Sequence, residues 1–138
     1  MIINISNHKL NENQTSSQEV VELPQELKAR WGQITPEEVI DLCEDILSWV
    51  QDLTRYEDEK TYIHIAGHAS AVHYIVDNIK YGSVTARDRS SQFNGVVMYA
   101  HSVRESVESV QEDGSVVKRN VFNFQGWYNY HTNQKVVF

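Results

Sequence analysis

The stretch that decides the fold runs from Thr61 to Ser91 and reads TYIHIAGHASAVHYIVDNIKYGSVTARDRSS. Its first part, Tyr62–Ala66, is a short β-branched run before a glycine, which is typical of a buried strand. From Ala69 apolar residues recur every three or four positions up to Gly82, and this spacing predicts a helix. Val84–Ala86 then has the composition of a second short strand. The stretch therefore predicts a βαβ unit, in which the strands are parallel and ligands bind beyond their carboxyl ends.

The length and charge of the chain limit the classes of protein to which it can belong. A chain of 138 residues is the size of one domain, so we expect a single domain over residues 1–138. The formal charge of −7 argues against binding to long nucleic acid, which depends on many Lys and Arg contacts to phosphate. No apolar run approaches the ~20 residues of a membrane helix and no signal-peptide pattern opens the chain, so we expect a cytoplasmic protein. Cys43 is the only cysteine and lies among apolar helix positions, which favours a structural role.

Further elements precede the βαβ unit. Ile2–Ile5 is apolar and β-branched and predicts the first strand. Residues 9–22 are mostly polar and read as a long loop, either a lid or a disordered segment, and we favour a lid. Pro24–Trp31 predicts a short helix, and Thr35 followed by Pro36 opens a longer one that reaches Leu53.

The second half of the chain predicts a long hairpin. Val96–Ala100 is a strand candidate, and Asp113-Gly114 is the preferred pair for a two-residue type I′ turn. That turn would place Val110 opposite Val117 and Glu108 opposite Arg119, with Val103 opposite Phe124. The predicted fold is α/β, a small Rossmann-like three-layer domain with parallel central strands and a C-terminal antiparallel β-hairpin. An exposed hairpin edge invites pairing with a second copy, so we expect a homodimer or larger, with the ligand site near the subunit junction.

Polar residues follow each of the three predicted parallel strands, and they are candidates for a ligand site. Neighbouring parallel strands end at one edge of a sheet, where a helix N-terminus also directs free N–H groups toward an anion. An arginine can hold phosphate, and His8 or His68 can act as an acid or base near neutral pH. The candidate residues are Ser6, Asn7, His8, Gly67, His68, Ala69, Ser70, Arg87, Arg89 and Ser90. This set predicts a phosphorylated ligand.

Simpler roles for the same residues stay open. His68 can merely cap the helix, and Arg87 and Arg89 can form surface salt bridges on an acidic protein. The six histidines have no metal-binding spacing, so we expect neither a metal site nor a cofactor.

Three of these motifs also resemble a known group of proteins. The segments IINISNH (residues 2–8) and HIAGHAS (residues 64–70), and the arginine-containing strand end after Val84, are similar to small Rossmann-like proteins of CRISPR and phage neighbourhoods. These include viral ring nucleases, which cleave cyclic oligoadenylate messengers, and CRISPR-associated Rossmann fold domains that bind such ligands. The resemblance implies a catalytic role for His68, a ligand-binding role for Ser6 and Asn7, and phosphate-holding roles for Arg87 or Arg104.

Three functions follow as hypotheses. The first is a nucleotide-binding enzyme of antiviral defence that cleaves a cyclic oligonucleotide without a metal, with His68 protonating the leaving oxygen. The second is a protein that sequesters a cyclic oligoadenylate or related signalling nucleotide without cleaving it. The third is a structural or protein-interaction module that binds no nucleotide.

Overall fold

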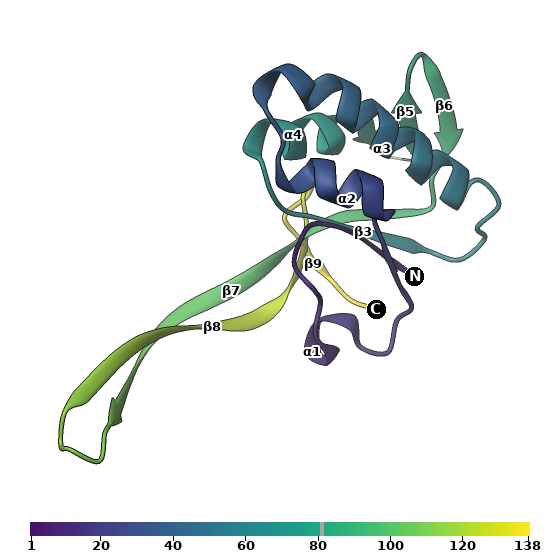
Figure 1. Cartoon of the computed structure of the whole chain (residues 1–138). Coiled ribbons are helices and arrows are strands. Elements are labelled where there is room, and N and C mark those ends of the chain that lie inside the picture. The colour runs from purple at the N-terminus through teal and green to yellow at the C-terminus, as the bar shows by residue number, and fades with distance from the viewer. Residues whose placement is uncertain (81) are drawn as a thin grey trace.

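The protein is built around a mixed six-stranded sheet (Figure 1). The computed structural model describes residues 1–80 and 82–138. The strands of the sheet, in spatial order, are β2 (Val20–Glu22), β1 (Ile2–Ile5), β3 (Thr61–Ile65), β7 (Gly95–Val110), β8 (Val116–Asn129) and β9 (Lys135–Val136). The first four are parallel to one another, whereas β8 and β9 are antiparallel to their neighbours. The predicted α/β fold with parallel central strands and a C-terminal hairpin is confirmed.

Helices α2, α3 and α4 cover one face of the sheet (Figure 1). They are α2 (Gln25–Gly32), α3 (Val39–Thr54), which a 3-10 turn at Pro36–Glu38 precedes, and α4 (Ala69–Asn78). The inward face of α3 is apolar, with Leu42, Cys43 and Ile46 fully buried against Ile63 and other strand residues. Both helices that the sequence predicts before β3 are therefore present, and Cys43 has the structural position expected of it.

The other face of the sheet is covered by the N-terminal loop and the end of the chain. Helix α1 (Glu12–Thr15) lies below this face in Figure 1, near the C-terminus. Ile2, Tyr62, Met98 and Trp127 form a second apolar cluster here. The Trp127 indole N–H donates to the backbone carbonyl of Gln14, 2.7 Å away, and so fixes the loop to the sheet. Residues 9–22 thus hold a helix and an edge strand, and the prediction of one continuous loop is wrong.

The prediction that Val84–Ala86 is the third parallel strand is also wrong. This segment belongs to β5 (Ser83–Ala86), the middle strand of a separate antiparallel sheet with β4 (Ile79–Lys80) and β6 (Arg89–Gln92). Arg87 and Asp88 both adopt positive φ, as a two-residue hairpin turn requires, so the chain reverses at once instead of ending at the edge of the large sheet. The parallel neighbour of β3 on the side away from β1 is β7, whose register pairs Ile63 with Val97. Helix α4 accordingly ends at Asn78, earlier than Gly82.

The long hairpin is present with a register that differs from the prediction by one residue. Val110 pairs with Val116, Glu108 with Lys118 and Val103 with Asn123. The Gly114 N–H donates to the Gln111 carbonyl, and the Gln111 N–H donates to the Ser115 carbonyl, so the loop has three residues. Gly114 occupies the left-handed position, with φ of 84°, that a three-residue loop needs.

None of the helices in the described part of the chain is long and apolar enough to cross a membrane.

Candidate functional site

The candidate site lies where the carboxyl ends of β1 and β3 meet. The chain leaves β1 toward β2 on one side and returns to β3 on the other, so these two strands flank the point where the strand order reverses. Ligands of open α/β sheets bind at such points. The Ala66 N–H donates to the Ile5 carbonyl, 3.1 Å away, and holds the two strand ends together. The structure thus brings Ser6–His8 and Gly67–Ser70 to one edge, as the sequence predicts.

Ser6 stabilises the turn that follows β1. Its hydroxyl is fully buried, donates to Asn4 Oδ1 over 2.7 Å and accepts from the His8 N–H over 3.2 Å. Asn4 in turn donates to the His8 carbonyl and to Glu22, so the turn after β1 is closed by its own side chains. The side chains of Asn7 and His8 are exposed and free to meet a ligand.

A tryptophan from α2 covers the turn after β3. The Trp31 indole N–H donates to the Ala66 carbonyl over 3.0 Å, and its ring lies against Gly67. A Cβ on Gly67 would come within 2.7 Å of Trp31 Nε1, and the φ of 150° is also unfavourable for other residues. Gly67 is therefore required for the close approach of Trp31.

The N-terminus of α4 opens beside Gly67. His68 is the N-cap residue, but no side chain caps the helix, so the first-turn N–H groups at Ala69 and Ser70 face outward. Both residues are exposed. Among the described residues, the buried Nδ1 of His68 has no hydrogen-bond partner. This end of α4 combines a positive dipole end with an imidazole nitrogen that is not engaged by the protein.

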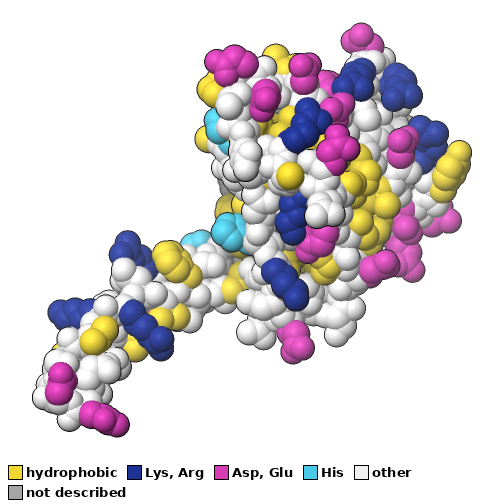
Figure 2. Space-filling model, in the orientation of Figure 1, with side chains coloured by type: hydrophobic (Ala, Val, Ile, Leu, Met, Phe, Trp, Pro, Cys, Tyr) yellow, Lys and Arg dark blue, Asp and Glu magenta, His cyan; other side chains and the backbone are white. Residues whose placement is uncertain are grey.

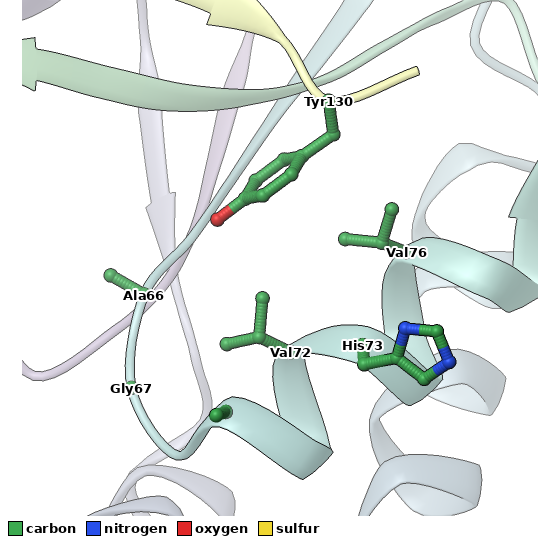
Figure 3. A pocket seen from close by; sticks show the side chains of 7 residues that line it. Ala66, Gly67, Val72, His73, Val76 and Tyr130 are labelled. Atoms are coloured by element: carbon green, nitrogen blue, oxygen red, sulfur yellow. The ribbon is translucent and has the colours of Figure 1, made fainter.

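A cavity of about 620 Å³ lies next to this helix end (Figure 3). Its residues are Ala66, Gly67, Ala69, Val72, His73, Val76 and Tyr130. In Figure 3 the Tyr130 ring lies over Val72 and Val76, with its hydroxyl toward Ala66. That hydroxyl donates to the Ile65 carbonyl, 3.0 Å away, and burial raises the pKa of the phenol, so Tyr130 stays neutral. The cavity is a mainly apolar slot with one aromatic wall.

Aromatic rings continue from Tyr130 toward the hairpin. The ring centroids of Tyr130 and Tyr99 are 5.0 Å apart, those of Tyr99 and Tyr128 are 6.0 Å apart, and those of Tyr128 and His101 are 5.7 Å apart. Tyr99, His101, Tyr128 and Asn133 line a smaller hollow of about 270 Å³. We call Tyr130, Tyr99, Tyr128 and His101 the aromatic row. It extends the cavity along the root of the hairpin.

Arg87, Arg89 and Ser90 do not belong to this edge. They lie in the β5–β6 hairpin, which packs against α3 in the helical layer (Figure 1). The Arg87 guanidinium bonds to Asp45, and its backbone N–H donates to Glu44 over 2.6 Å. Arg87 thus forms a salt bridge to an acidic residue of α3, which is the simpler of the two roles that the sequence leaves open. The interpretation of these residues as phosphate ligands fails because β5 is not a strand of the large sheet.

Replacing Arg87 with alanine should therefore lower stability without affecting a ligand at the carboxyl edge. Asp45 keeps its bond to Arg30, 2.9 Å away, and Arg87 is more than half exposed, so the loss should be about 0.2–1 kcal/mol in the free energy of unfolding. Urea denaturation measures the stability, and a nucleotide-binding assay on the same variant measures the affinity. A selective loss of nucleotide affinity at unchanged stability would contradict this placement.

Arg104 lies on β7 in the exposed part of the hairpin, opposite Phe122. It is remote in the fold from the α4 N-terminus, so its predicted phosphate contact within one copy is not supported. In the described part of the chain, no three His, Cys, Asp or Glu side chains are grouped as they would be to hold a metal ion.

Trp31 and Tyr130 are the site residues that the sequence did not reveal. Their hydrogen bonds join segments that are 35 and 65 residues apart along the chain, so no local pattern connects them to the GHAS turn. Val72, His73 and Val76 did carry a signal, because with Ala69 they share one helix face. The apolar spacing predicts one buried face with Val72, Ile75 and Val76; Ile75 is fully buried, whereas Val72 and Val76 are partly buried and also line the cavity.

Comparison with known proteins gives one finding. The family model described as "Uncharacterized protein MJ1673 family" matches residues 1–128. No curated protein and no solved structure matches the chain. The family description carries no activity, so the resemblance to viral ring nucleases stays a hypothesis. Since the match covers nearly the whole chain, the protein belongs to the MJ1673 family.

Proposed function

We propose that this protein binds a nucleotide of the cyclic oligonucleotide class at the carboxyl edge of β1 and β3, and that binding without turnover is its function. The observation that carries the proposal is the slot between Tyr130 and α4, which ends at the uncapped N-terminus of that helix. A nucleotide has a flat base that suits an apolar, aromatic slot and a phosphate that suits a helix N-terminus. The apolar, aromatic slot and the N-terminus of α4 lie side by side at this edge.

The aromatic row favours a ligand with more than one base. The rings of the row are partly or largely exposed, and the row begins at Tyr130, which lines the slot. Stacking is tolerant of base identity and contributes about 1–3 kcal/mol per base. A cyclic oligoadenylate, the ligand class that the sequence resemblance implies, would place one base in the slot and others along the row.

Sequestration is favoured over cleavage because of the charge of the site. Among the described residues that line the slot, none is Lys or Arg. Phosphodiester cleavage builds negative charge on the phosphate oxygens, which preorganised cations or several N–H donors must stabilise. The helix N-terminus alone supplies a partial charge of about half a unit.

Cleavage remains the second candidate because of His68. His68 is the N-cap residue of α4, where a ribose 2′-OH could lose its proton to water and attack the adjacent phosphorus while the protonated His68 imidazole gives a proton to the departing 5′-oxygen. One incubation separates the two functions. Labelled cyclic tri-, tetra- and hexa-adenylates are held with the protein in EDTA, and the ligand is recovered after denaturation. Intact ligand supports sequestration, and linear product that disappears in His68→Ala supports cleavage.

Removing the aromatic wall should weaken nucleotide binding. Tyr130→Leu keeps an apolar side chain but removes the ring, so the binding free energy of the cyclic adenylate should weaken by about 1–3 kcal/mol, which is roughly a 5-fold to 150-fold loss of affinity. Tyr130→Phe keeps the ring and should retain most of the affinity. Isothermal titration calorimetry measures both variants.

Tyr56→Leu is the matched control for Tyr130→Leu, because Tyr56 is 87% exposed and lies outside the slot. Its affinity should equal that of the unaltered protein. If no cyclic adenylate raises the melting temperature of the unaltered protein, the proposal fails, since a ligand at 100 times its dissociation constant stabilises by about 2.7 kcal/mol.

A further inference from the structure

The hairpin of β7 and β8 leaves the body of the protein as a long arm (Figure 1). We define the arm as residues 102–124. Among the described residues, each strand of the arm pairs only with the other, and its apolar side chains are uncovered, with Val110 75% and Phe122 69% exposed. An isolated two-stranded ribbon is at best marginally stable in water, and additional strands stabilise it. The arm is therefore built as one part of a larger sheet.

Both edges of the arm are unpaired, and the edge of β7 is the one that continues the edge to which β3 pairs. Strand β3 covers this edge only as far as Met98. The Gln111 N–H bonds inward to Ser115, and alternation along an antiparallel strand then turns the main-chain groups of the even-numbered residues outward. Those residues are Ser102, Arg104, Ser106, Glu108 and Val110. They form a continuous row of unpaired N–H and C=O groups.

We propose that two copies of the protein join through this edge, with their β7 strands antiparallel about a two-fold axis at Ser106. In that register Arg104 lies opposite the partner's Glu108, and the symmetry repeats the pair. Opposite charges directly across two strands attract, and they also fix the register. The result is a four-stranded ribbon with two attractive charge pairs and no like-charge pair across the new junction.

Neighbouring registers are electrostatically worse. A two-fold axis at Arg104 or at Glu108 places that residue opposite its own copy, and like charges directly opposite are destabilising. The outer edge of β8 is less suitable as well. An axis at Lys118 or Arg119 repeats a positive charge, and one at Asn120 forms no opposite-charge pair. The β7 edge is thus the one that is complementary to itself.

This register also brings the two copies together at the candidate site. Ser102 lies opposite the partner's Val110, so the tip of each arm reaches the level of His101. That level is just beyond the end of β3, the strand that leads into the Gly67 turn. Acidic side chains lie at the tip of the arm and basic ones nearer its middle (Figure 2). The arm of each copy therefore lies next to the carboxyl ends of β1 and β3 in the other copy. The junction forms through main-chain and charge contacts alone, so it does not require a nucleotide.

Charge reversal tests the register. Arg104→Glu places carboxylates opposite each other at both pairs, and Glu108→Arg places guanidinium groups there. Each variant alone should dimerise about tenfold or more weakly than the unaltered protein. An equimolar mixture of the two should form a heterodimer, because both of its pairs are again opposite in charge. Sedimentation equilibrium without nucleotide measures all three, and circular dichroism checks that each variant is folded.

A second pair of variants tests the edge without altering charge. Ser106→Pro removes an N–H that points outward, so it spares the hairpin ladder and should abolish the dimer. Ser106→Ala keeps the N–H and should leave the dimer intact. Monomeric unaltered protein, unaltered dimerisation of Arg104→Glu, or a mixture that stays monomeric would each overturn the proposal. Because no nucleotide is present, these outcomes are independent of whether the proposed ligand binds.

Discussion

Replacing Gly95 with alanine is expected to lower the free energy of unfolding by about 3 kcal/mol, the upper end of the effect of overpacking. Gly95 opens β7 and pairs with Thr61 of β3. A Cβ there would lie 1.7 Å from the Thr61 carbonyl oxygen and 2.7 Å from its carbonyl carbon. Both atoms are backbone, so the clash can be relieved only by moving β7 away from β3. Urea denaturation with a two-state fit measures the change.

Gly114→Ala is the matched control for that experiment. Gly114 lies at the tip of the arm, where an added Cβ would meet no described residue within 4 Å other than its two chain neighbours, and its φ is 84°. The substitution should lower stability only by the energy of a left-handed backbone conformation, about 1–2 kcal/mol. This effect should be confined to the arm. A Gly95→Ala protein as stable as the unaltered one would show that the β3–β7 junction is looser than the structure has it.

Acidification from pH 6.5 to pH 4 is expected to remove about 3 kcal/mol of stability through His64 alone. His64 is buried on β3, and its Nδ1 lies 2.9 Å from Asn4 Oδ1. Burial, with a smaller effect of His8, lowers the pKa of His64 to about 4. In the unfolded chain the pKa of histidine is near 6.5, so the folded state resists protonation that the unfolded state accepts. Stability is complete above pH 6.5 and declines as the pH falls toward 4.

The hydrogen bonds explain why protonation is unfavourable at this position. Asn4 donates through Nδ2 to the His8 carbonyl and to Glu22, so its Oδ1 accepts and the neutral His64 donates from Nδ1. A second proton on Nε2 would place a cation in a buried setting beside the Trp127 ring, whose centroid is 4.9 Å from that of His64. His64→Gln keeps a donor for Asn4 and cannot gain the proton.

The experiment compares the pH dependence of unfolding in urea for two variants. His64→Gln should lose less stability than the unaltered protein between pH 6.5 and pH 4. His73→Gln, which removes an exposed histidine of α4, should follow the unaltered protein. Parallel curves for the unaltered protein and His64→Gln would mean that His64 gains its proton without cost.

Local sequence was sufficient for most elements and for half of the candidate site. The strands at Ile2–Ile5 and Thr61–Ile65 and helices α2 to α4 follow from apolar spacing and helix-start residues, because these signals act within a few positions. Polar residues after β1 and β3 were predicted to meet, and they do, since adjacent parallel strands end at the same edge.

Most of the errors concern which segments pair with each other, and one concerns the elements within residues 9–22. Val84–Ala86 lies in a strand, β5, as predicted, but so short a segment does not specify which sheet it joins. The β3 edge was taken by β7, whose buried Val97 and Met98 suit a central position better. The one-residue error in the hairpin arose because Asp113-Gly114 fits both a two-residue and a three-residue loop. Residues 9–22 are polar and carry no local strand or helix pattern, and their structure depends on contacts with Trp127 and β1, which are distant in sequence.

By itself, the sequence determined the α/β class, the order of its main elements and the position of the GHAS turn at a strand-to-helix junction. These features depend on periodicity and on backbone preferences, which are properties of short segments. Only the tertiary structure decided that Trp31 covers this turn, that Tyr130 forms the wall of the slot and that Arg87 turns away toward Asp45. Each of these contacts joins distant segments, and its formation depends on how whole elements pack, which no local pattern encodes.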